Sequence, residues 1–104
     1  RRRVVSQITI PNETEIEKVE MVTTLIKEAI ASVTTIEGVI CDRCHFQTFG
    51  ASALVFETVY YVPSPDYVVY MNVQQEINLM LLKRFRQEGI KFAYPTQKIF
   101  TVQG

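Results

Sequence analysis

The stretch ALVFETVYYV, residues 53–62, is the strongest strand signal in the chain and decides the fold. It consists largely of β-branched and aromatic residues, which favour strands. Alternate positions from Leu54 to Val62 share one face, as in a strand that packs on a core. A second strand pattern, Cys44–Phe49, is separated from it by only three residues, the first of them Gly50. Because this connection is so short, the two strands are predicted to pair as an antiparallel hairpin.

The residues before this hairpin predict a strand followed by a helix. Val4–Ile10 alternates between two faces, and Pro11 ends the strand because proline cannot donate a hydrogen bond to a sheet. Apolar residues then recur at helical spacing, and Asn12 or Thr14 is the expected helix cap. The expected core face of this first helix is Ile16, Val19, Ile26, Ile30 and Val33.

The residues after the hairpin predict a second helix and a last strand. Ser64 before Pro65, or alternatively Asp66, starts the helix, and Gly89 ends it. Its expected core stripe is Val69, Val73, Ile77, Met80, Leu81 and Phe85. A final strand is predicted at Lys98–Val102, after Pro95 has interrupted the chain.

The predicted order is therefore β-α-β-β-α-β, which is typical of an α+β fold. Two helices packed on one face of an antiparallel sheet make the ferredoxin-like arrangement. This fold carries many functions, so the fold alone predicts none of them.

Two leucines of the second helix lie away from its core stripe. Leu79 and Leu82 share a face with Val68 and Met71. One interpretation is a contact with a neighbouring subunit, since exposed apolar patches mark interaction surfaces. The other is simply a wide core stripe.

The composition indicates one small globular domain and excludes several functional classes. The chain has 104 residues, of which 47% are apolar and 21% charged. Lysine and arginine total 11, as do aspartate and glutamate, so the basic excess of a nucleic-acid binder is missing. No apolar run approaches the ~18 residues of a membrane span. No catalytic triad, phosphate-binding glycine loop or other enzyme motif is present, so catalysis is not expected.

The stretch CDRCH, Cys41–His45, matches the haem-attachment pattern and the C-x-x-C spacing of redox and metal sites. A structural zinc site usually takes four ligands, and Cys41, Cys44 and His45 supply three at most. Residues three apart in a strand point to opposite faces, so the two thiols are expected to diverge. We therefore expect no cofactor. The competing hypothesis is a regulatory domain of the same fold that binds a small ligand, or a metal through these three residues.

Three stretches together resemble a known family: DRCHF (residues 42–46), FETVYYVPSPDY (56–67) and INLMLLKRFRQEGIKFAYPTQKIF (77–100). They are similar to the C-terminal cytoplasmic domain of small-conductance mechanosensitive channels of the MscS type. In that family a similar hairpin leads to a helix, which ends in a Gly-Ile-x-Phe-x-x-Pro segment before a final strand. The resemblance covers nearly the whole chain.

The resemblance implies a structural role within an integral membrane channel. The pore-forming helices would lie upstream of Arg1, and this domain would form part of a cage at the cytoplasmic face of the cell's inner membrane. Family channels are homo-oligomers, namely heptamers, and the last strand leaves its domain to build a barrel with neighbouring subunits. The resemblance thus implies two parts: residues 1–96 form the ferredoxin-like domain, and residues 97–104 form a C-terminal strand for oligomerisation. The oligomerising strand would consist of Gln97, Lys98, Ile99, Phe100, Thr101 and Val102.

Overall fold

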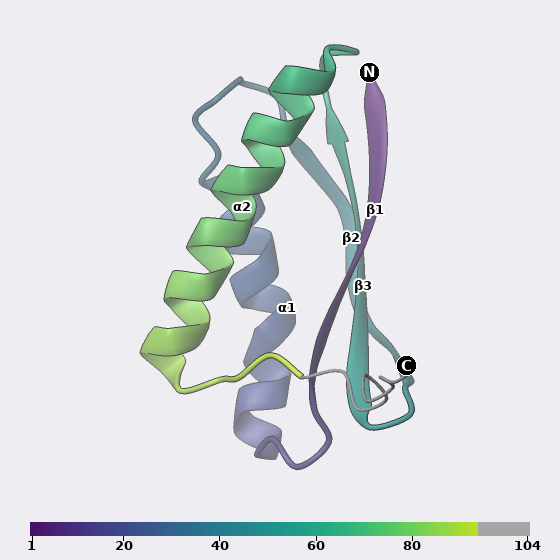
Figure 1. Cartoon of the computed structure of the whole chain (residues 1–104), viewed down its shortest axis with the longest axis vertical. Coiled ribbons are helices and arrows are strands. Elements are labelled where there is room, and N and C mark those ends of the chain that lie inside the picture. Colours follow the sequence, from purple (N-terminus) through teal and green to yellow (C-terminus); the bar gives the residue numbers. More distant parts are fainter. Residues whose placement is uncertain (94–104) are drawn as a thin grey trace, which may run out of the picture.

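The computed structural model describes residues 1–93 as one two-layer α+β unit (Figure 1). The elements follow in the order β1 (Arg2–Pro11), α1 (Ile16–Ala31), β2 (Ile40–Phe49), β3 (Ala53–Val62) and α2 (Tyr67–Glu88). Both helices cover the same face of the sheet. The predicted α+β class is confirmed, as are the first five elements of the predicted order. The predicted last strand and the boundary at residue 97 lie outside the described residues and stay predictions.

The hairpin predicted from residues 53–62 is present, and β3 is the centre of the sheet. The strand order is β1-β3-β2, and both pairings are antiparallel. At the turn, the Gly50 amide donates to the Ala53 carbonyl at 2.7 Å. A central strand is flanked on both sides, which explains why β3 is so rich in apolar residues.

The core lies between the sheet and the two helices. Phe56 and Tyr60 project from β3 into this layer and are almost fully buried. The predicted core stripe of α2 is confirmed for Val73, Ile77, Leu81 and Phe85, which are buried, whereas Val69 and Met80 are only partly buried against the core. Further buried apolar residues come from β3 itself, the outer strands, α1 and the segment after α2, and they include Leu54, Val62, Val4, Ile10, Val22, Leu25, Ile26, Ala29, Ile30 and Ile90.

Helix α1 differs from its prediction at the start and on one face. The N-cap is Glu15, whose side chain makes no capping hydrogen bond. Thr14 is not the cap, because its hydroxyl donates to the Pro11 carbonyl at 2.7 Å in the preceding turn. The prediction that Ile16 lies in the core is wrong. Ile16 is the first residue of the helix, and its side chain is 63% exposed.

Helix α2 begins and ends with well-defined caps. The Asp66 side chain accepts a hydrogen bond from the Val68 amide at 2.9 Å, so Asp66, the second of the two predicted starts, is the cap. Ser64 supports it, since its hydroxyl accepts from the Asp66 amide at 3.1 Å. Gly89 ends the helix as predicted, with a positive φ of 72° that favours glycine.

Strand β2 is longer than predicted and is bulged twice. The register shifts between Cys41 and Arg43 and again between Phe46 and Thr48. A bulge places two residues opposite one, which resets the alternation of side chains along the strand. Cys41 consequently lies opposite Tyr60, and Cys44 lies opposite Thr58. The predicted divergence of the two thiols is therefore wrong, because both lie on the helix-facing side of the sheet.

One carboxylate fixes the loop between α1 and β2 to helix α2. Glu76 accepts hydrogen bonds from the amides and the hydroxyls of both Thr34 and Thr35, at 2.7–3.1 Å. These bonds favour the charged form, with the Thr34 hydroxyl contributing most. They hold the pKa of Glu76 at about 2, below its ordinary value of 4.5.

The contribution of Glu76 to stability is expected to depend on pH. Because its pKa is lower in the folded chain, this contribution is complete above about pH 4.5 and is lost as the pH falls towards 2. Glu76→Gln should cost about 1 kcal/mol at pH 7, since solvent competes for these exposed bonds. Urea unfolding between pH 2 and pH 7 measures both effects. The difference between the two chains should shrink towards pH 2, and a difference independent of pH would contradict this assignment.

Candidate functional site

The outer face of α2 carries an apolar stripe that residues 1–93 leave largely uncovered. We call Val68, Met71, Leu79 and Leu82 the outer stripe. Val68 and Leu79 are 11 residues apart, as are Met71 and Leu82, and this spacing is about three helical turns. Leu79 is 59% exposed and Val68 63%, whereas Leu82 is half-buried. Of the two interpretations left open by the sequence, the wide core stripe fails for Leu79.

The outer stripe is suited to association and not to chemistry. Its side chains are aliphatic or thioether groups, which neither transfer protons nor bind hard ligands. Fully burying one leucine is worth about 1.5–3 kcal/mol, so covering several of these side chains together would favour association. Of the residues predicted to contact a neighbouring subunit, only Leu79 and Leu82 lie in the part of the chain that the structure describes, and both belong to the outer stripe.

The segment after α2 is fixed firmly to the domain. We call residues 89–93 the exit segment. The amides of Gly89 and Ile90 donate to the carbonyls of Arg86 and Phe85, at 3.3 and 2.8 Å, which is the Schellman pattern of a helix end. Ile90 is buried in the core.

Two further contacts join the exit segment to helix α2 and strand β1. The Phe92 ring stacks on Phe85 with 4.6 Å between the ring centroids. The Ala93 amide donates to the Thr9 carbonyl at 2.9 Å. The sequence predicted only that Gly89 stops the helix, although an apolar residue directly after such a glycine is a known signal for this type of anchoring.

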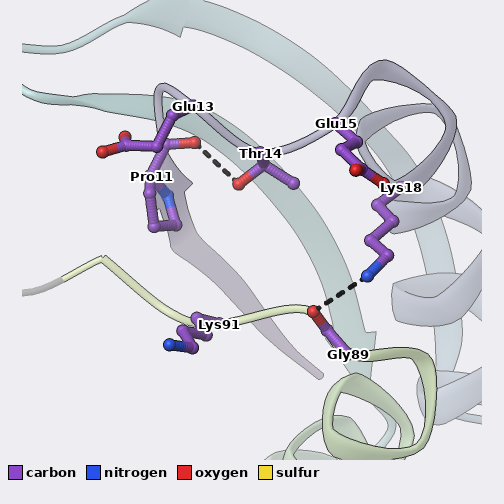
Figure 2. Close-up of a pocket in the computed structure, with 7 residues that line it drawn as sticks. All are labelled: Pro11, Glu13, Thr14, Glu15, Lys18, Gly89 and Lys91. Atoms are coloured by element: carbon purple, nitrogen blue, oxygen red, sulfur yellow. Dashed lines mark hydrogen bonds between the residues drawn. The ribbon is translucent and has the colours of Figure 1, made fainter.

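A pocket of about 230 Å³ lies where the exit segment meets the β1–α1 turn (Figure 2). Lys18 extends from α1, and its Nζ donates to the Gly89 carbonyl at 3.3 Å. An ammonium at the carbonyl end of a helix also complements the helix dipole. The rest of the lining is Pro11, Glu13, Thr14, Glu15 and Lys91. The Lys18 contact makes this pocket part of the anchoring of the exit segment.

The CDRCH stretch does not form the three-ligand site of the competing hypothesis. Cys44 faces the helices opposite Thr58, whereas His45 lies opposite Glu57 on the other face of the sheet. Residues 1–93 contain no group of three or more histidine, cysteine, aspartate or glutamate side chains placed to hold a metal ion. Asp42 and Arg43 form an ion pair at 3.1 Å, but both side chains are exposed, so the pair adds little stability.

The other predicted site residues, Gln97–Val102, lie outside the described part of the chain. Within residues 1–93, neither helix has the length and apolarity needed to cross a bilayer.

Comparison with known families decides where this fold belongs. The family model described as "Mechanosensitive ion channel MscS, C-terminal" matches residues 4–92. The chain belongs to the MscS C-terminal domain family. This confirms the resemblance drawn from the three stretches, and the family is one of channels, not of enzymes.

Individual relatives agree with this family. The chain is 32% identical over 101 residues to the small-conductance mechanosensitive channel MscMJ of Methanocaldococcus jannaschii, covering 96% of this chain. It is 27% identical over 101 residues to the large-conductance mechanosensitive channel MscMJLR of the same organism, covering 94% of this chain. In both cases the match spans 28% of the relative's length.

Solved structures show the same fold. Two cryo-EM structures of Arabidopsis thaliana MSL1 match with TM-scores of 0.67 and 0.64 and sequence identities of 18% and 19%. Each match covers 90% of this chain and about a third of the other, at 33% and 34%. At this identity the likeness establishes the fold, and this α+β unit accordingly recurs within a much larger chain.

Proposed function

We propose that this MscS domain is an assembly unit in the cage of a mechanosensitive channel. It acts at the cytoplasmic face of the inner membrane, within a parent protein that releases solutes on osmotic shock. The partner is a further copy of the same chain, and the family resemblance implies a heptamer. The domain performs no catalytic step and needs no cofactor for this role.

The observation that carries the proposal is the outer stripe of α2. Four apolar side chains that share the outer face of a helix are not favoured in contact with water. We therefore expect another surface to cover them. The stripe lies on the side of α2 away from the buried Val73 and Ile77, and three of its four side chains remain exposed in the domain by itself. Contact with a neighbouring subunit accounts for both the apolar character and the position.

The exit segment supports the same role in a different way. Its contacts with α2 and β1 fix the direction in which the backbone arrives at Ala93. We propose that residues 97–102 then form the strand shared among subunits, with Pro95 redirecting the chain. A defined exit direction would reduce the entropy that each subunit loses when such a strand is built.

Leu79→Glu is expected to disrupt assembly of the parent channel. The substitution places a charge on the outer stripe, where it would lose its hydration in a subunit contact. Native mass measurement of the full-length channel in detergent should show a smaller assembled fraction, and protection of cells against hypo-osmotic shock should fall with it.

Gln87→Glu is the matched control for this experiment. Gln87 is also exposed on α2 and also gains one negative charge, but it lies off the outer stripe. It should assemble normally, and circular dichroism should show both variants folded. Normal assembly of Leu79→Glu, or equal loss in both variants, would contradict the role of the stripe.

A further inference from the structure

We propose that Cys41 and Cys44 form a two-coordinate site for a soft monovalent metal ion, Cu(I) in particular. The proposal rests on the bulge in β2, which brings both cysteines to the helix-facing side of an edge strand. An open hollow of about 360 Å³ lies beside them, bordered by Lys27 of α1 and residues 41–45. The site is independent of the outer stripe and of the assembly role.

The spacing of the two cysteines suits a bridging ion and lies near the upper limit for a disulfide. Their partners on β3, Tyr60 and Thr58, are two residues apart, which corresponds to about 6.5–7 Å along a strand. Disulfides usually join Cα atoms about 4.4–6.8 Å apart, most often about 5.5–6 Å. An ion with metal–sulfur bonds of about 2.3 Å, as in zinc thiolates, lets the two sulfurs stay about 4–5 Å apart. Both cysteines are indeed free thiols.

The number and type of donors select the class of metal. Thiolates are soft ligands, and they favour Cu(I) over hard cations such as Mg²⁺ or Ca²⁺. Structural zinc requires four ligands, and in the described part of the chain no third histidine, cysteine or carboxylate joins the two thiols. Cu(I) can be held by two thiolates alone. His45, on the other face of the sheet, is not needed.

The cationic side chain of Lys27 borders the hollow and faces the site. Both cysteines are free, and a cysteine thiol ordinarily keeps its proton at neutral pH. Binding then exchanges two S–H protons for one Cu(I), giving a bis-thiolate complex of charge −1 and two released protons. The Lys27 ammonium would compensate this charge, whereas the Asp42 carboxyl group, which also borders the hollow, would not. The Thr58 hydroxyl already donates to the Cys44 sulfur at 3.3 Å and would remain a donor to the thiolate.

Cu(I) titration of the 104-residue chain tests the proposal. The chain competes with a chromophoric Cu(I) chelator under nitrogen, with a reductant that contains no thiol. We expect one Cu(I) per chain. Cys41→Ser should weaken binding by at least about 100-fold, beyond the usual effect of removing an outer-shell partner. Cys41 is the first choice because it is only half-buried, so its replacement should leave the fold intact by circular dichroism.

Two further variants separate this site from its alternatives. His45→Ala should bind as the unaltered chain does, whereas Cys44→Ser, if folded by circular dichroism, should lose binding as Cys41→Ser does. Equal loss in His45→Ala would overturn the two-thiolate site. So would unchanged binding in Cys41→Ser, or a native mass showing that the ion bridges two chains. Oxidation of the pair to a disulfide, in place of Cu(I) binding, would also overturn it.

Discussion

Replacing Phe85 with alanine is expected to lower the free energy of unfolding by about 3–5 kcal/mol. Phe85 has no exposed surface, and its ring packs both on the core and against Phe92 of the exit segment. Its removal leaves a cavity that the sheet and the two helices cannot close without moving together. Urea unfolding of the 104-residue chain, followed by circular dichroism, measures the loss.

Leu79→Ala is the control for Phe85→Ala, because it removes an apolar side chain from the solvent-facing side of the same helix. It should change the free energy of unfolding of the unassembled chain by no more than about 0.5 kcal/mol. If the two substitutions had similar effects, the assignment of an inner and an outer apolar face to α2 would be wrong.

Ile90→Ala is expected to cost about 2–5 kcal/mol and to loosen the exit segment. Ile90 is 4% exposed and is the first buried residue after the helix stop. Without its side chain, the Ile90 amide can still bond the Phe85 carbonyl, but the segment loses its hydrophobic anchor. Hydrogen exchange at the Ala93 amide, which bonds Thr9, should become faster along with the loss of global stability.

Lys91→Ala is the matched control for this second prediction. Lys91 is the adjacent residue, is exposed, and lines the pocket at the β1–α1 turn. It should leave both the unfolding free energy and the exchange of the Ala93 amide nearly unchanged. Unaltered exchange at Ala93 in Ile90→Ala would show that the exit segment is held without this anchor.

The sequence was sufficient for the elements that follow a regular period. The alternation in β3 and the helical spacing in α2 each extend over enough residues to be unambiguous. In α1, two apolar rows overlap, so Val22, Leu25 and Ala29 were missed although all three are buried. Which row faces a core is decided by the partner layer, and a single helix sequence does not contain that information.

The bulges of β2 could not be predicted, because no residue near them carries the usual sequence signal of a bulge. The register shifts fall around Asp42 and Gln47, neither of which is a glycine or proline that would mark a bulge. Simple alternation then assigned the two thiols to opposite faces. The outer stripe was found from spacing alone, but its exposure depended on knowing where the core lay. The exit contacts join residues far apart in the sequence, such as Thr9 and Ala93, and no local pattern encodes them.

The exit segment also has a mechanical consequence for a domain that belongs to a force-gated channel family. A pull on the backbone at Ala93 would first load the single hydrogen bond to Thr9, then the Phe92–Phe85 stack, and only then the buried Ile90. The contacts would therefore break one after another, beginning with the most exposed and ending with the most deeply buried. Small forces would be borne first by the bond to β1, and α2 would be loaded through Phe85 once that bond gave way.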